Sequence, residues 1–228
     1  MIDIDENIAA IWQRINVSLA KQADAERPIT LVAVSKRQPI GAIRAALEAG
    51  QRHFGENYLQ EAVVKIRELA HKKAVWHFIG ALQSNKTALV AEHFDWVHSV
   101  DRLKIAQRLS RQRSPEQQAL NICLQVNIDA DPAKSGIPPE TCLSVARQII
   151  GLPQLRLRGL MVLPAKAATD GTNSFTRAQQ LFVDMQEALN SEEFDTLSMG
   201  MSQDFELALA NGATLLRLGT AIFGQRSP

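Results

Sequence analysis

A lysine follows directly on an apolar run near the start of the chain. Residues Ile29 to Val34 have the length and the β-branched content of a buried strand, and Ser35, Lys36 and Arg37 come next. On spacing alone, Lys36 is a surface residue whose stem lies on the protein while its ammonium reaches water. Alternatively, it lies at the mouth of an apolar pocket, where desolvation favours the neutral amine that attacks an aldehyde. The strand by itself does not decide between these interpretations.

Two glycine-containing segments in the last part of the chain could bind an anion. They read SMGMS at 198–202 and RLGTAIFG at 217–224. Gly200 and Gly219 allow the backbone to approach a ligand closely, and Ser202 is expected to begin a helix whose free N–H groups suit a phosphate. Alternatively, Ser202 merely caps that helix and the glycines merely turn the chain. The two segments together favour phosphate, whereas Ser202 alone leaves both interpretations open.

Arg217 interrupts the otherwise apolar strand LLRLG. Because a buried charge is costly without a partner, we predict that this side chain points toward a ligand acceptor or a carboxylate. Neither glycine segment contains the GK[ST] of a P-loop, and no GxGxxG follows the first strand, so a nucleotide-type phosphate site is not predicted. The sequence GMSQD also lacks the second glycine of a GxSxG elbow, which argues against a hydrolase.

The histidines and cysteines give weaker signals. His77 lies in a buried strand, where a hydrogen-bonded core histidine is the commoner case. The other histidines have no metal-ligand spacing, so no metal site is predicted; they are His53, His71, His93 and His98. The two cysteines, Cys123 and Cys142, form neither a disulfide framework nor a CxxC pattern, and we interpret both as packing residues.

Strand and helix patterns alternate along the chain. Eight strands are predicted, at 29–34, 53–57, 75–79, 96–100, 121–127, 157–162, 196–199 and 214–218, and a helix follows each of the first seven. Strict alternation implies parallel strands with helical crossovers. Eight such units fit a compact (β/α)8 TIM barrel, preceded by an additional N-terminal helix over 3–24. The alternative is an open doubly wound sheet. No linker is apparent, so residues 1–228 are predicted to form a single domain.

A barrel would bring the chemical candidates together, because the C-terminal ends of its strands meet on one face. The residues expected there, besides Lys36, are Asn57, Gly80, Asn127, Met161, Ser198, Ser202, Gly219 and Thr220. Phosphate sites in such barrels use the loops after strands seven and eight, and these are the two glycine segments. Two other loops are noted: a flexible one over 164–173, and Asp129 to Ile137 with Lys134-Ser135-Gly136, which is interpreted as a solvated turn rather than a mobile lid.

Composition limits the partners. The formal net charge is +1 and the isoelectric point is near 7.8, so no overall field attracts nucleic acid or an anionic membrane. The N-terminal segment MIDIDENIAA lacks the basic flank and the apolar block of a signal peptide, and no stretch of about 18 apolar residues occurs. We therefore expect a cytoplasmic protein that binds neither nucleic acid nor membrane.

A lysine amine near a phosphate site is what pyridoxal phosphate (PLP) requires, for its aldehyde and its phosphate ester. The chain closely resembles the pyridoxal phosphate homeostasis protein family along nearly its whole length. The motifs that carry this resemblance are AVSKRQP at 33–39, FGENYLQE at 54–61, WHFIGALQSNK at 76–86, KSGI at 134–137, RGLMVLP at 158–164, SMGMSQDFELA at 198–208 and RLGTAIFG at 217–224.

The resemblance implies a fold-type III PLP-binding barrel like the N-terminal domain of alanine racemase. It implies that the cofactor is held as a Schiff base on Lys36. It further implies that Arg217 faces the pyridine nitrogen and that Asn57 and Met161 line the ring pocket. The phosphate would be held by Ser202, Gly219 and Thr220.

Two functions share such a site. The resemblance implies a monomeric, non-catalytic protein that buffers PLP or delivers it to PLP-dependent apoenzymes, and so acts in vitamin B6 homeostasis and indirectly in amino-acid metabolism. The alternative is a PLP-dependent amino-acid racemase, which needs an acid or base on each face of its substrate. Related racemases take their second base, a tyrosine, from another domain of a partner subunit, whereas this chain stops at Pro228 and has only Tyr58. We therefore expect a carrier rather than an enzyme.

Overall fold

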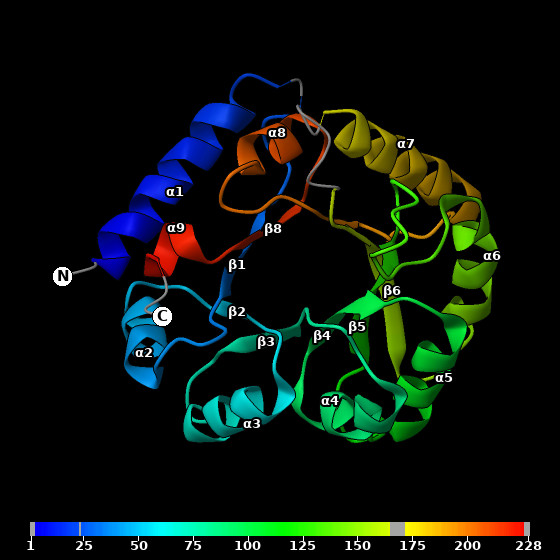
Figure 1. The fold of residues 1–228 in the computed structure, drawn as a ribbon, viewed down its shortest axis with the longest axis horizontal. Helices are drawn as coiled ribbons and strands as arrows, with labels where there is room; N and C mark the ends of the chain where they lie inside the picture. Colours follow the sequence, from blue (N-terminus) through cyan, green and yellow to red (C-terminus); the bar gives the residue numbers. More distant parts are fainter. Residues whose placement is uncertain (1–2, 23, 165–171, 226–228) are drawn as a thin grey trace.

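The computed structural model describes residues 3–22, 24–164 and 172–225, and its strands form a closed parallel barrel (Figure 1). Each strand pairs with its sequence neighbour, and β1 pairs with β8 to close the ring. The predicted (β/α)8 barrel is confirmed, and the alternative of an open sheet is wrong. Most of the loop predicted over 164–173 lies outside the described residues. The strands are β1 Thr30–Val34, β2 His53–Glu56, β3 Val75–Phe78, β4 Trp96–Val100, β5 Leu120–Val126, β6 Leu155–Val162, β7 Thr196–Ser198 and β8 Leu215–Leu218.

Helices surround the barrel, as Figure 1 shows. The predicted helices all occur, with ends that differ by a few residues, and a short 3-10 turn, η1, precedes α4. One helix, α9, is missing from the prediction, which has only a tail after the last strand. The helical elements are α1 Ile4–Leu19, α2 Ile40–Glu48, α3 Leu59–Glu68, η1 Ser84–Lys86, α4 Thr87–His93, α5 Leu103–Gln112, α6 Pro139–Ile150, α7 Thr172–Leu189, α8 Phe205–Ala210 and α9 Thr220–Phe223.

The strands are buried on both faces, which explains their nearly continuous apolar sequences. Val34 of β1 and Ile79 after β3 line a cavity at the barrel mouth. Because successive side chains of a strand alternate between its faces, Ala33 and Phe78 point the other way, toward the helices. Phe78 there packs edge-on against Phe94, with ring centroids 5.3 Å apart.

Gly159 permits the close approach of β6 and β7. Its φ is +151°, and a β-carbon at this position would lie 1.8 Å from the carbonyl oxygen of Thr196. No other residue fits without moving the strands apart, so this glycine helps to set the register in which Gly159 pairs with Thr196.

The N-terminal helix α1 packs outside the barrel against α2, α8 and α9. Asp3 caps it by accepting a hydrogen bond from the backbone N–H of Glu6 at 3.1 Å. Its buried side recurs at helical spacing and consists of Ile8, Ile11, Ile15 and Leu19. In the described part of the chain, no helix has the length and apolar character needed to cross a membrane.

Candidate functional site

The C-terminal ends of the strands surround a cavity of about 340 Å³. All seven residues expected to contact a cofactor line it, namely Lys36, Asn57, Met161, Ser202, Arg217, Gly219 and Thr220. The lining also includes Val34, Ile79, Leu163, Met201, Gln203 and Asp204. Parallel strand ends converge on one face of a closed barrel, and this topology brings together residues that are up to 186 positions apart, from Val34 to Thr220.

The backbone on both sides of Lys36 is held by side chains. The carbonyl of Ser35 accepts a hydrogen bond from Lys65 Nζ at 2.7 Å. The N–H of Arg37 donates to Glu61 Oε1 at 2.6 Å. Arg37 has a φ of +59°, a left-handed conformation that is uncommon for a residue with a β-carbon. The chain therefore turns sharply just after Lys36, and both neighbouring peptide groups are anchored to α3.

A group of charged side chains lies behind this turn, and we call Lys65, Glu56 and Glu61 the lysine cluster; Lys65 and Glu56 are buried, and Glu61 is partly exposed. Lys65 is 4% exposed and lies 2.8 Å from Glu56 Oε1, whose side chain is fully buried. Ser35 Oγ donates to the same carboxylate oxygen at 2.6 Å. Burial raises the pKa of Glu56, and the hydrogen bonds from Lys65 and Ser35 oppose this rise.

Sequence reasoning missed the role of Lys65. On α3 it follows the residues of the FGENYLQE motif, and a single lysine on an amphipathic helix is normally read as solvent-exposed. The one available signal was the spacing of Glu61 and Lys65, which places them on the same side of a helix. Nothing in the sequence indicated that this side faces Ser35.

Arg217 lies inside the barrel mouth, as predicted, and is 5% exposed. Its Nη1 donates to Ser198 Oγ at 2.6 Å and its Nη2 donates to the carbonyl of Val162 at 3.1 Å. Burial lowers the pKa of Arg217 to about 10, while Cys123 and Asp204 nearby oppose this effect. The guanidinium is thus cationic at neutral pH. Its partners are a hydroxyl and a carbonyl rather than the carboxylate that the sequence analysis allowed.

The two glycine segments meet, but Ser202 does not begin a helix. The next helix, α8, starts at Phe205, so the predicted capping position of Ser202 is wrong. Instead, Ser202 Oγ accepts a hydrogen bond at 3.3 Å from the N–H of Ala221, in the first turn of α9. Asp204 closes its own turn by accepting from the N–H of Met201 at 2.6 Å. The loops before α8 and α9 are therefore linked through Ser202, which lies with Gly219 and Thr220 along one side of the cavity.

Asn57 carries an acceptor with no partner. Its Oδ1 atom is buried and has no hydrogen bond within the described part of the chain. Gly80 approaches the Asn57 backbone so closely that a β-carbon would lie 2.3 Å from the Asn57 carbonyl oxygen, which holds the residue in place. A buried acceptor without a partner is costly. Because Asn57 lines the cavity, a donor on a bound ligand would satisfy it.

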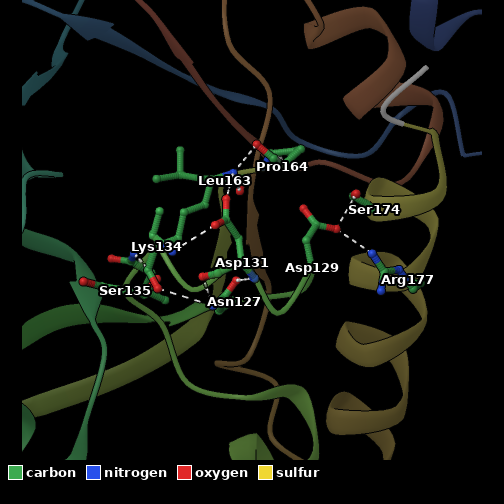
Figure 2. A network of polar contacts seen from close by, with 11 residues as sticks. Asn127, Asp129, Asp131, Lys134, Ser135, Leu163, Pro164, Ser174 and Arg177 are labelled. Carbon is green, nitrogen blue, oxygen red and sulfur yellow. Dashed lines mark hydrogen bonds and ion pairs between the residues drawn. The ribbon is translucent and has the colours of Figure 1, made fainter. Parts of the chain in front are cut away.

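The loop from Asp129 to Ile137 is tied to its surroundings (Figure 2). Lys134 Nζ donates to the carbonyl of Leu163 at 2.9 Å and also to that of Pro164, just after β6. Asn127 Oδ1 accepts from the N–H of Asp131 at 3.0 Å. On the other side of the loop, Asp129 accepts from Ser174 and Arg177 of α7. The predicted turn is thus held to two neighbouring elements, and Lys134 does not line the cavity described above.

Both cysteines are buried and unpaired, in agreement with their interpretation as packing residues. Burial raises the pKa of Cys123 and of Cys142 to about 12. Both thiols are therefore protonated at neutral pH, and neither lines the cavity.

The fold and the cavity define a barrel of the alanine racemase type. The family described as "Alanine racemase, N-terminal domain" matches residues 8–227. An alanine racemase from Corynebacterium glutamicum has the same fold, with a TM-score of 0.70 at 15% identity, over 98% of this chain and 60% of that one. This distant likeness concerns the fold alone.

Much closer relatives share one name, "Pyridoxal phosphate homeostasis protein". The relative from Pseudomonas aeruginosa is 52% identical over 99% of this chain and 97% of its own length. The relative from Escherichia coli is 48% identical over 99% and 98%. The chain therefore belongs to the pyridoxal phosphate homeostasis protein family. PipY of Synechococcus elongatus, solved with PLP bound, superposes with a TM-score of 0.80 at 40% identity, over 92% of this chain and all of PipY.

Proposed function

We propose that this protein binds pyridoxal 5'-phosphate in the cavity at the barrel mouth and acts in vitamin B6 homeostasis by buffering or delivering it. The observation that carries the proposal is that a lysine, a buried arginine and two linked glycine loops line the same cavity of about 340 Å³. These are the groups needed to hold an aldehyde, a pyridine ring and a phosphate ester.

The residues of the cavity fit this cofactor one by one. Lys36 supplies the amine for a covalent link, and its backbone is anchored on both sides. Ser202, Gly219 and Thr220 would hold the phosphate at the start of α9, and Met161 would pack against the ring. The unpartnered Oδ1 of Asn57 would accept a hydrogen bond from the cofactor. When bound, pyridoxal phosphate supplies an electrophilic carbon and an electron-withdrawing ring.

Arg217 would face the pyridine nitrogen. Its charge is fixed at neutral pH, and two of its guanidinium nitrogens already donate to Ser198 and Val162. A cationic donor at this position favours an unprotonated ring nitrogen and so weakens the ring as an electron sink. This supports storage of the cofactor more than carbanion chemistry.

The names of the relatives support the same role. Those from Pseudomonas aeruginosa and Escherichia coli are called homeostasis proteins rather than enzymes, and PipY was solved with PLP. In our proposal the protein works as a monomer, as one domain, and gives the cofactor to PLP-dependent apoenzymes.

A racemase is the alternative function, and the position of Tyr58 argues against it. Racemisation needs a second acid or base that faces the substrate. Tyr58, the only tyrosine in the sequence, is 45% exposed and does not line the cavity, and the Arg37 guanidinium lies 5.4 Å from its ring centroid. We therefore propose that Lys36 anchors the cofactor and does not serve as a catalytic base.

An absorption spectrum with and without added PLP tests the binding site. We expect a visible band that borohydride removes, after which peptide mapping finds the label on Lys36. Lys36→Ala should abolish the band, whereas Lys104→Ala, a change at an exposed lysine on α5, should leave it intact. Label scattered over surface lysines would contradict the proposal.

An amino-acid racemisation assay distinguishes carrier from enzyme. We expect the loaded protein to turn over alanine no faster than free PLP does. Turnover well above that of the free cofactor, abolished by Lys36→Ala, would establish the racemase instead.

A further inference from the structure

A line of hydrogen-bonded imidazoles runs through the barrel to Arg217, and we call His53, His77, His98 and Ser198 the histidine chain. His53 Nδ1 lies 2.9 Å from His77 Nε2, His77 Nδ1 lies 2.9 Å from His98 Nε2, and His98 Nδ1 lies 2.9 Å from Ser198 Oγ. Ser198 then accepts from Arg217 at 2.6 Å. The sequence analysis treated these histidines as separate residues.

The histidine chain connects the two ends of the barrel. His53 begins β2, and it lines a second cavity of about 410 Å³ near the N-terminal ends of β1 and β2. His77 is two residues further along the barrel than the β3 partner of His53, because His53 pairs with Val75. Ser198 ends β7 and adjoins Arg217 at the opposite mouth. Barrel interiors are usually filled by bulky apolar side chains, so a continuous polar line is an exception with a cost.

Every ring nitrogen of the two inner histidines has a partner within the chain. His77 and His98 are fully buried, and each uses one nitrogen toward each neighbour. A neutral imidazole has one N–H and one acceptor nitrogen. When all three imidazoles are neutral, a ring that donates to its neighbour therefore requires the facing nitrogen of that neighbour to be an acceptor. All three rings must carry their proton on the same nitrogen, either Nδ1 or Nε2.

The two arrangements differ at Ser198. When the protons are on Nε2, the Ser198 hydroxyl donates to His98, and its oxygen accepts from Arg217. When the protons are on Nδ1, His98 donates to Ser198, so the Ser198 oxygen accepts from His98 and Arg217 together. Only the second arrangement is compatible with a charged His53, because a protonated ring must donate through Nδ1 to His77.

The charged and titratable groups around the chain differ from end to end. Asp95 interacts with His53 and opposes the lowering of the His53 pKa by burial. Burial lowers the pKa of His77 and of His98 well below 6.5, and His98 also feels the charge of Arg217. Trp96 stacks on His77, with ring centroids 5.4 Å apart, and contributes no charge. Because His53 is less buried than the inner histidines and lies near Asp95, it takes up a proton more readily than they do.

We propose that His77 and His98 are positioning residues for Arg217. Protonation of His53, at the N-terminal end of the barrel, sets the direction of the hydrogen bonds along the histidine chain and so changes how Arg217 is held in the cofactor cavity. The consequence for PLP rests on the proposed function. The direction of hydrogen bonds in the histidine chain does not rest on the proposed function, since it involves only residues of this protein. With His53 charged, Ser198 is shared between two donors, its bond to Arg217 weakens, and the guanidinium is held less firmly.

The first experiment measures the tautomers without cofactor. Nitrogen-15 shifts of the histidine rings distinguish Nδ1–H from Nε2–H. We expect His77 and His98 to have the same tautomer at neutral pH, and both to carry Nδ1–H once His53 is protonated. Different tautomers on His77 and His98, or Nε2–H on either while His53 is charged, would overturn the proposal.

The second experiment measures the dissociation constant of PLP as a function of pH. His77→Phe interrupts the chain without touching the cavity, and we expect binding to weaken about fivefold, which is the net worth of one hydrogen bond. Trp96→Phe, in contact with the same ring, is the matched control and should change binding by less than about twofold. An equal effect of both variants would mean that packing, not the chain, is responsible.

A third variant keeps the test decisive if His77→Phe does not fold. His53→Phe changes only the half-buried end of the histidine chain. The ratio of its dissociation constant to that of the wild type removes every pH dependence that the two proteins share. We expect the wild type to lose affinity relative to His53→Phe as the pH falls through the titration of His53. A ratio that is independent of pH would refute the coupling. If the wild type does not bind PLP at all, the proposed function fails, while the tautomer measurement still decides the direction of the chain.

Discussion

Two polar networks hold residues that line the cavity, and they differ in length and in charge. The lysine cluster next to Lys36 is short and charged, with Lys65 and Glu56 2.8 Å apart and both almost fully buried. The histidine chain next to Arg217 is long and, along its inner part, neutral, because burial lowers the pKa of both His77 and His98. Each network holds a different residue that lines the same cavity.

These two networks tolerate burial for different physical reasons. A buried charge needs an opposite charge at contact distance, so the lysine cluster is confined to the end of β2 and the neighbouring helix α3. Neutral imidazoles need only hydrogen bonds, so they can be joined in a line that crosses the interior. The lysine cluster holds one backbone turn, whereas in our proposal the histidine chain relays a change of hydrogen-bond direction from His53 to Arg217.

Breaking the lysine cluster should have the largest effect on stability. Lys65→Met leaves Glu56 buried without its cation, and we expect the free energy of unfolding to fall by about 3–5 kcal/mol. Urea denaturation measures this loss. The matched control is Arg44→Met, because Arg44 also lies 2.8 Å from its partner, Glu68, but both side chains are 46% exposed. There we expect a loss of about 0–1 kcal/mol.

A double variant sharpens this comparison. If the cost of Lys65→Met comes from the uncompensated carboxylate, then adding Glu56→Gln should recover part of the stability. If instead the losses of the two single variants simply add in the double variant, then packing of the lysine stem, rather than charge, accounts for the cost of Lys65→Met.

The histidine chain should make the fold sensitive to acid. His77 and His98 have folded-state pKa values well below 6.5, so the unfolded state binds more protons once the pH falls below 6.5. The free energy of unfolding should therefore be highest above pH 6.5 and should fall on acidification until the folded-state pKa values are reached. Two such groups give a limiting slope of about 2.7 kcal/mol per pH unit.

Urea denaturation at a series of pH values measures this slope, and His77→Phe provides its control. Removing one of the two buried histidines should halve the limiting slope, whatever its effect on stability at neutral pH. A slope that is the same in the variant and the wild type would mean that His77 is charged in the folded protein or that other groups dominate the acid response.

The smallest effect is expected outside both buried networks, in the loop shown in Figure 2. Lys134 is 26% exposed, and its amine donates to the backbone carbonyls of Leu163 and Pro164 in part-buried contacts. Lys134→Met should lower the free energy of unfolding by less than about 1 kcal/mol. Urea denaturation of Lys134→Met and Lys65→Met under the same conditions checks this ranking. A loss of several kcal/mol in Lys134→Met would contradict it.

Much of the fold could be predicted because it depends on local patterns. Buried strands and amphipathic helices alternate with periods that are visible within a few residues, and Gly50, just after α2, has the positive φ that is typical of a glycine at a helix end. The short helix α9 was missed, because its four residues are too few to show a period. The start of α8 was placed too early, since Ser202 has a capping residue type but bonds to Ala221 instead.

The candidate cavity was predicted through topology. Once eight alternating units imply a closed barrel, Lys36, Arg217 and the glycine loops must lie at the same mouth. The residues that support them were not predicted. Lys65 was not singled out, and among the histidines only His77 was interpreted as a core residue. A contact across a helix interface or across the barrel produces no local sequence pattern.

Local sequence patterns were enough to predict the barrel, a lysine just after its first strand, and two loops suited to an anion. These follow from periodicity, from residue type and from the fixed direction of parallel strands. The folded structure was needed to show that Lys65 faces Ser35 and that a line of hydrogen bonds leads to Arg217 through His53, His77, His98 and Ser198. Hydrogen bonds require contacts of about 3 Å, and such contacts between distant residues depend on strand register and barrel closure, which no local pattern specifies.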